Sequence, residues 1–119
     1  MVRRSSNLSR PRIDHLFSVD KVREQQNLKL HYGDLLDVSA LLRIISSIQP
    51  DEVVNLGAQS HVAVSFEVPI ETSLITGVGA ASLFEAIRIV NPEIRVYQAS
   101  SSEMYGGGHI SQPLNELSP

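Results

Sequence analysis

The chain has 119 residues, of which 42% are hydrophobic and 19% are charged, a composition typical of one globular domain with a single core. Its net charge of -3 favours neither nucleic acid nor an anionic membrane as a partner. The lack of cysteine excludes disulfides and thiol catalysis, and no apolar run approaches the roughly 18 residues of a membrane span. No apolar segment of a secretory signal follows the basic N-terminus, so we expect a cytoplasmic protein.

The first 27 residues are expected to form a basic arm or loop ahead of a folded part that spans residues 28–119. The arm is polar, carries Pro11 and several serines, and has little helix or strand period. From residue 28 the pattern changes, because apolar and polar side chains alternate over 28–32. This alternation predicts a short strand, which Gly33 ends.

Two helices and two further strands follow in alternation. Asp37 is a suitable N-cap for an apolar helix that ends before Pro50. The stretch "EVVNLGAQS" predicts a strand that breaks into a small-residue turn, and "IRVYQAS" predicts the last strand. Between them, Pro69 is a suitable first-turn residue for a long helix that reaches about Val90. Its middle, "TGVGAAS", is rich in small residues, so we expect close backbone packing there.

The order of strand, helix, strand, helix and strand predicts an α/β fold with a parallel sheet and helices on its faces. Ligands of such sheets collect beyond the carboxyl ends of the strands. All three predicted strand ends carry polar or small residues, in "HYGD", "NLGAQSH" and "QASSSE". We therefore expect a binding site at this edge of the sheet.

The first two strand ends have the residue types of a nucleotide site. The Asp34 carboxylate could accept hydrogen bonds from an adenine amino group, or it could simply cap a turn at the end of the strand. In the second end, Gly57 and Ala58 would let a ligand approach the backbone closely. Gln59 and Ser60 could then bind ribose or phosphate oxygens, although an ordinary loop would also account for these residues.

The third strand end has residue types that can move a proton. In an extended segment, Ser101 and Glu103 would point to the same face, where a hydroxyl could stabilise a developing oxyanion and a carboxylate could transfer a proton. The alternative is a serine-rich turn with a solvated glutamate. His61 is expected to be structural, and nothing groups it with the other histidines in a metal site.

Taken together, "MVRRSSN", "LHYGDLLD", "NLGAQSHVAVSFE" and "YQASSSEMYG" resemble the GDP-mannose 4,6-dehydratases of the extended short-chain dehydrogenase/reductase superfamily. The resemblance implies a partial Rossmann-like, doubly wound parallel sheet, with NADP as cofactor and GDP-mannose as substrate. It also implies a lyase that forms GDP-4-keto-6-deoxy-mannose, in the part of nucleotide-sugar metabolism that leads to GDP-fucose and other deoxysugars.

The resemblance also implies roles for individual residues. Glu103 matches the acid/base that removes the C5 proton, and Ser101 stands where the family usually has a threonine that holds the sugar hydroxyl. Glu71 departs from the family, which often has a cofactor-contacting tyrosine there. The implied cofactor-binding residues are Arg3, Arg4, Ser5 and Ser6 at the 2′-phosphate, Asp34 and Leu35 at the adenine, and Leu56, Gly57, Ala58, Gln59 and Ser60 along the cofactor.

Three features of the family do not occur in this sequence: the first strand with its glycine-rich turn, the Tyr-x-x-x-Lys pair, and the C-terminal sugar-binding part. Its only lysines are Lys21 and Lys29, and neither follows a tyrosine at the required spacing. We therefore expect a fragment, inactive alone, that is part of a dehydratase. The alternatives are a non-catalytic remnant that joins a full-length dehydratase and a related nucleotide-sugar dehydratase or epimerase. We also expect a homo-oligomer formed through the helix at 70–90 and the arginine arm.

Overall fold

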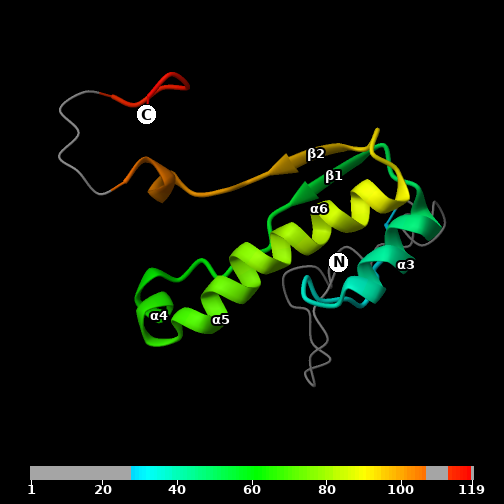
Figure 1. Ribbon diagram of the computed structural model, residues 1–119, viewed down its shortest axis with the longest axis horizontal. Coiled ribbons are helices and arrows are strands. Elements are labelled where there is room, and N and C mark those ends of the chain that lie inside the picture. The colour runs from blue at the N-terminus through cyan, green and yellow to red at the C-terminus, as the bar shows by residue number, and fades with distance from the viewer. Residues whose placement is uncertain (1–27, 107–112, 119) are drawn as a thin grey trace.

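A computed structural model describes residues 28–106 and 113–118 (Figure 1). The expected arm, with Arg3, Arg4, Ser5 and Ser6, lies outside these residues, as do the side chains of Ser102 and Glu103. The elements, in chain order, are α3 (Val38–Ile48), β1 (Glu52–Asn55), α4 (Val62–Glu67), α5 (Pro69–Ser73), η1 (Leu74–Val78), α6 (Gly79–Val90), β2 (Arg95–Gln98) and η2 (Ser102–Tyr105).

Helix α3 begins and ends as the sequence predicts. The Asp37 carboxylate accepts hydrogen bonds from the backbone N–H of Ala40 at 2.9 Å and from the hydroxyl of Ser39 at 2.7 Å. At the other end, Gln49 has a left-handed φ of 48°, and its N–H donates to the carbonyl of Ile45 at 2.8 Å. The helix is therefore closed at both ends by local hydrogen bonds.

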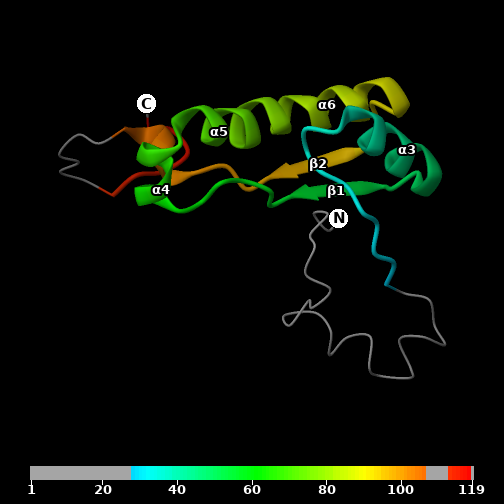
Figure 2. The same ribbon diagram turned by 90° about the horizontal axis from the view of Figure 1, so that it is seen from below.

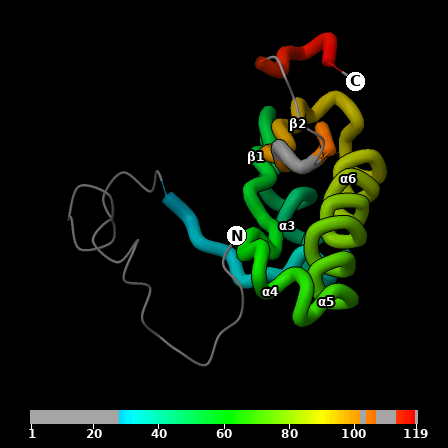
Figure 3. The backbone as a smooth tube through the Cα atoms, turned by 90° about the vertical axis from the view of Figure 1, so that its left-hand side faces the viewer, coloured from blue at the N-terminus to red at the C-terminus, as the bar shows by residue number. Residues whose placement is uncertain are grey.

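Strands β1 and β2 form a parallel two-stranded sheet, which confirms the predicted α/β class. The register pairs Glu52 with Arg95 and Asn55 with Gln98. The N–H of Ala99 extends the ladder by donating to the carbonyl of Asn55 at 3.1 Å. Because the strands are parallel and in register, their carboxyl ends lie at the same edge, as the arrowheads in Figure 1 show. Figure 3 shows β1 and β2 side by side.

The strand predicted over residues 28–32 is not formed, and that prediction is wrong. Among the described residues the sheet contains β1 and β2, and Tyr32 alone takes part in an isolated bridge. Leu28 and Tyr32 are 37% and 67% exposed. Alternation specifies a strand when the segment has a neighbouring strand to pair with, and neither β1 nor β2 forms a ladder with this segment.

The long helix predicted from Pro69 to about Val90 is confirmed, with a change of winding in its middle. Elements α5, η1 and α6 follow one another without a break, and Pro69 occupies the first turn. In η1 the helix is a π-helix, and the N–H of Gly79 donates to the carbonyl of Leu74, five residues earlier.

Close packing against the small residues of this helix occurs at one glycine and not at another. A Cβ atom on Gly79 would lie 2.9 Å from the Cβ of Leu35, so this glycine permits a close approach. A Cβ atom on Gly77 would have no neighbour within 4 Å. The expectation of close packing is therefore right for Gly79 and wrong for Gly77.

By length and composition, the 22-residue helix Pro69–Val90 could cross a membrane, contrary to the expectation that no apolar run approaches that length. Core helices of globular domains meet the same criteria, so this is weak evidence for a span. Helix α6 buries one face and carries the exposed ion pair Glu85–Arg88, whose N and O atoms are 2.7 Å apart. The buried residues of α6 are Gly79, Leu83, Ala86 and Ile87.

The core lies between α3, α6 and one face of the sheet. Figure 2 shows α6 running along this face, with α5 beyond the ends of the strands. Val53 of β1 packs against the core from this face. The opposite face presents the register partners Val54 and Tyr97, which are 60% and 62% exposed. The doubly wound arrangement stays a prediction, because the described helices that pack on the sheet cover one face. The buried residues of the core are Leu35, Leu41, Ile45, Leu83, Ala86, Ile87 and Ile94.

Candidate functional site

A pocket of about 400 Å³ lies where the turn before α3, the turn after β1 and the long helix meet. It brings together five of the residues that the sequence assigns to cofactor binding. Glu71 from α5 and Ile75 from η1 complete its wall. The lining residues are Gly33, Asp34, Leu35, Gly57, Ala58, Gln59, Glu71 and Ile75.

The Asp34 side of the pocket is fixed by the start of α3. The Asp34 carboxylate accepts a hydrogen bond from the N–H of Leu36 at 3.1 Å, and the Asp34 carbonyl accepts one from the N–H of Asp37 at 3.0 Å. These two bonds form an Asx-type turn that leads directly into the N-cap of the helix. Both predicted functions of Asp34, as a capping residue of a turn and as an acceptor at a pocket wall, are compatible with this arrangement.

The Gly57 side of the pocket depends on a buried asparagine that sequence reasoning missed. Asn55 is only 4% exposed, and its side-chain oxygen accepts a hydrogen bond from the N–H of Gly57 at 3.0 Å. Its side-chain nitrogen donates to the side-chain oxygen Oε1 of Gln98 at 2.7 Å, across the sheet. A Cβ atom on Gly57 would lie 2.6 Å from Cδ1 of Leu35, so a larger residue would crowd the pocket wall. An asparagine that ends an apolar strand before a glycine turn was the available signal.

Gln59 lines the pocket with its side chain already engaged. Its side-chain oxygen accepts a hydrogen bond from the N–H of His61 at 2.5 Å, and its side-chain nitrogen donates to the His61 carbonyl at 3.1 Å. Its own N–H donates to the hydroxyl of Thr76 at 3.2 Å. Gln59 therefore holds the shape of its loop. The predicted contact of its amide with ribose or phosphate would require these bonds to His61 to open.

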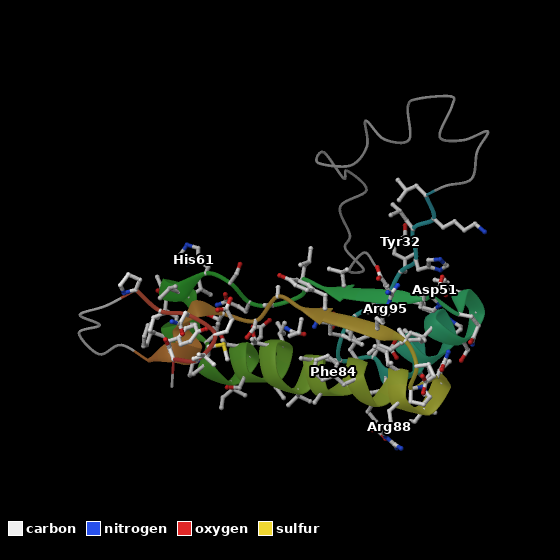
Figure 4. The ribbon with its side chains drawn as sticks, turned by 90° about the horizontal axis from the view of Figure 1, so that it is seen from above. Tyr32, Asp51, His61, Phe84, Arg88 and Arg95 are labelled. Carbon is white, nitrogen blue, oxygen red and sulfur yellow. The ribbon has the colours of Figure 1, made fainter. Side chains whose placement is uncertain are left out.

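Two of the assigned cofactor residues lie outside the pocket. Leu56 is 72% exposed and borders a second, apolar groove of about 570 Å³ between α3 and β1. Ser60 is exposed and does not line either cavity. His61 is also exposed, and Figure 4 shows its side chain pointing away from the helices.

Ser101 and Glu103 follow β2 at the same edge of the sheet as Gly57, but the backbone there is not extended. Residues 102–105 form the 3₁₀-helix η2, so the expectation that alternate side chains share a face is wrong. Ser100, directly before them, has a positive φ of 57°, an uncommon conformation for a non-glycine residue that turns the chain out of β2. Ser101 is exposed and does not line the pocket, and Figure 1 shows η2 apart from α4 and α5.

The charges at the pocket are negative. Asp34 and Glu71 both line it, and no lysine or arginine does so in the part of the chain that the structure describes. Arg3 and Arg4, which the resemblance assigns to a phosphate, lie outside that part. Within the same residues, no three histidine, aspartate or glutamate side chains are grouped as metal ligands would be. The pocket can therefore offer acceptors to hydroxyl and amino groups.

Comparison with known proteins supplies the family. The family model described as GDP-mannose 4,6 dehydratase matches residues 1–119. GDP-mannose 4,6-dehydratase of Vibrio cholerae serotype O1 is 53% identical over 87% of this chain and 28% of its own length. GDP-mannose 4,6 dehydratase 1 of Arabidopsis thaliana is 46% identical over 100% of this chain and 34% of its own length. The human GDP-mannose 4,6 dehydratase is 44% identical over 89% of this chain and 29% of its own length.

The chain thus spans about a third of the length of these relatives. The match to the family model covers every residue, and the identities extend over most of the chain. On this basis the protein belongs to the GDP-mannose 4,6-dehydratase family.

Proposed function

We propose that this chain is the nucleoside-binding part of an NADP-dependent GDP-mannose 4,6-dehydratase with a Rossmann-like fold. The observation that supports this most is the convergence of Asp34, Leu35, Gly57, Ala58 and Gln59 on one pocket. These residues come from two turns about 20 residues apart in the sequence, one before α3 and one after β1. Their convergence in space supports a binding site.

The pocket fits the adenosine end of a dinucleotide. Its volume of about 400 Å³ lies in the range of small-molecule sites, roughly 300–1,000 Å³. Asp34 offers an acceptor for an amino or hydroxyl group, and Gly57 leaves the backbone open to close approach. The 2′-phosphate would need a cation that the described lining does not supply, and we propose that Arg3 and Arg4 provide it through charge-assisted hydrogen bonds.

We propose that Ser101 and Glu103 act on the sugar. Bound NADP would supply the hydride acceptor for oxidation of the hexose and the hydride donor for the later reduction. The Ser101 hydroxyl would hold the sugar hydroxyl that is oxidised at C4. The Glu103 carboxylate would take the C5 proton, which the neighbouring C4 ketone acidifies, and would help the C6 hydroxyl leave as water.

The 119 residues themselves are proposed to bind cofactor without turnover. No tyrosine in this sequence is followed four positions later by a lysine, so the C4 base of the family has no counterpart among these residues. Removal of the proton from the C4 hydroxyl, as the hydride leaves C4, would then depend on groups from other polypeptide segments. A cytoplasmic location is part of the same proposal.

An association role is the second candidate, and exposed apolar side chains on the long helix favour it. Ile70, Leu74 and Val78 repeat every four residues and are 75%, 42% and 49% exposed. A stripe of this kind suits packing against another helix, in a second copy of this chain or in a full-length dehydratase. The expected homo-oligomer would use this stripe.

The test is a titration of the full 119-residue chain with NADP, monitored by isothermal calorimetry because the chain contains no tryptophan. We expect saturable binding and no formation of the 4-keto product from GDP-mannose. Gly57→Ala should weaken binding by about tenfold, because the added methyl crowds Leu35 at the pocket wall. Gly77→Ala, where a methyl meets nothing within 4 Å, is the matched control. Product formation would overturn the absence of turnover, and equal affinities of the two variants would overturn the pocket assignment.

A further inference from the structure

The π turn η1 lies beside the pocket, in the middle of an otherwise regular helix. In this turn the N–H of Gly79 reaches the carbonyl of Leu74, so the turn holds one residue more than an α-helical turn. Such turns are rare and frequently occur at functional sites. Their geometric effect is large, because removing one residue would rotate the preceding helix by roughly 100°, the angle per residue of an α-helix. The winding of η1 therefore sets where the side chains of α5 point.

The first link between η1 and the pocket is a hydrogen bond. The Thr76 hydroxyl accepts from the N–H of Gln59 at 3.2 Å and joins segments 17 residues apart. The side chain of Gln59 is bound to the backbone of His61, so it does not compete for this contact. The backbone of the loop after β1 is therefore connected to the helix through Thr76.

The second link is steric. Ile75, in η1, lines the pocket itself. Gly79, directly after η1, lies against Leu35, because a Cβ atom added at Gly79 would be 2.9 Å from the Cβ of Leu35. Leu35 also lies against Gly57, where an added Cβ would be 2.6 Å from Cδ1 of Leu35. The helix forms one wall of the pocket. The other two walls, the Leu35 turn and the Gly57–Gln59 loop, therefore both contact this helix at η1 or at the residue that follows it.

We propose that the π turn Leu74–Val78 is the positioning element of this pocket, and that Thr76 is the residue through which it holds the Gln59 loop. Thr76 does not touch the bound molecule. It keeps the loop at the distance from Ile75 and Leu35 that the nucleoside requires. The identity of the ligand rests on the proposed function, whereas the positioning of the loop does not.

The experiment compares Thr76→Val, Thr76→Ser and Thr72→Val in the full chain. Valine removes the acceptor at nearly constant volume, and serine retains the hydroxyl. Thr72 is a matched control on the same helix, because its hydroxyl donates only to the carbonyl of Val68, at 2.9 Å. Three quantities are measured: NADP affinity, the hydrogen-exchange rate of the Gln59 amide by NMR, and the urea midpoint of unfolding.

Thr76→Val should raise both the exchange rate of the Gln59 amide and the Kd for NADP by about three- to tenfold, the usual net effect of one hydrogen bond. The urea midpoint should stay near that of Thr72→Val, because Thr76 is exposed. Thr76→Ser should restore both values. If Thr76→Val matches Thr72→Val in amide exchange and affinity, the inference is overturned. If the unmodified chain does not bind NADP, the proposed function fails and the Gln59 amide alone decides the inference.

Discussion

The two ends of the long helix are built differently. At the α6 end, Leu83, Ala86 and Ile87 are at most 6% exposed and pack on Leu41 and Ile45 of α3. At the other end, none of the residues of α4, α5 or η1 is buried. The pocket lies at this second end and is held by single contacts, such as the bond from Gln59 to Thr76 and that from Gly57 to Asn55.

Because of this difference, the stability of the domain and its affinity for a ligand should depend on different residues. Burial at the α6 end contributes to the free energy of unfolding of the whole domain, because each side chain there contacts several others. A hydrogen bond at the pocket end constrains one loop and contributes about 1 kcal/mol. Substitutions at the packed end should therefore lower global stability, and substitutions at the pocket end should change ligand affinity more than they change unfolding.

The largest expected effect is a loss of stability on substitution at the packed α6 end. Ile87→Ala should lower the free energy of unfolding by about 2–5 kcal/mol, because it leaves a cavity at a residue only 4% exposed. Ile89→Ala, two residues on in the same helix and 55% exposed, should change it by less than about 0.5 kcal/mol. Urea unfolding followed by circular dichroism gives both values, and equal losses would contradict the burial pattern of α6.

The next largest effect is a change of stability at Gly79, where the π turn η1 meets α6. Gly79→Ala should cost about 1–3 kcal/mol, because its methyl would meet the Cβ of Leu35, an atom that cannot move without the backbone. Gly77→Ala meets nothing and should stabilise the helix by up to about 1 kcal/mol. Thermal unfolding of the two variants should therefore shift in opposite directions. A shift in the same direction would mean that Leu35 is not held against the helix.

A smaller effect on NADP affinity is expected from the charge of Glu71 at the pocket end. Glu71 adds a negative charge to a pocket proposed for an anionic cofactor, so Glu71→Gln should tighten NADP binding by about two- to fivefold at low salt. The gain should shrink as salt is added. Glu67→Gln, which removes the same charge outside the pocket lining, is the control. A gain of the same size in both variants would assign the effect to net charge.

The smallest expected effect is a pH dependence at the start of α3. The hydrogen bond from the Ser39 hydroxyl, followed by that from the Ala40 N–H, holds the pKa of Asp37 below its ordinary value of 3.8. A lowered folded-state pKa means that the stabilising cap is fully present above pH 3.8 and is lost as the pH falls through the lowered value. Asp37→Asn, which can cap without titrating, should not show this loss. Unfolding curves that fall equally in acid for both proteins would contradict this assignment.

Much of the fold is encoded in local signals that act over a few residues. Asp37 caps α3, Pro69 begins the long helix, and "EVVN" and "RVYQ" form strands, all as the sequence predicts. The prediction of a strand over residues 28–32 is wrong because alternation of apolar and polar residues does not by itself supply the neighbouring strand with which a segment must pair. Nor does apolar spacing distinguish a π turn from an α-helical turn over five residues, so η1 could not be predicted.

The site was predictable in part, since glycines and short polar side chains at strand ends mark where a ligand can approach. The rule holds for Gly57, which follows β1, whereas Asp34 reaches the pocket from the turn before α3 and not from the end of a strand. The contact of Gln59 with Thr76 does not follow from it, because the winding of η1 decides which residue faces the loop. The 3₁₀ turn at Ser102–Tyr105 was missed for a similar reason, because a serine-rich segment can adopt several local conformations.

The buried amide of Asn55 also determines how the two strands align. It lies opposite Gln98 in the ladder, and only that neighbour offers its side-chain nitrogen an acceptor across the sheet. A slip of β2 by one residue would place Tyr97 or Ala99 there. Alanine has no side-chain acceptor, and the phenol oxygen of tyrosine lies at the far end of its ring, too far from the backbone to meet the short Asn55 amide as Gln98 does. The unsatisfied group would cost about 1–3 kcal/mol, comparable with a sizeable share of a small domain's stability. Two four-residue strands are thus held in one register by a polar pair at each end, the buried Asn55–Gln98 bond and the exposed Glu52–Arg95 ion pair, whose N and O atoms are 2.6 Å apart.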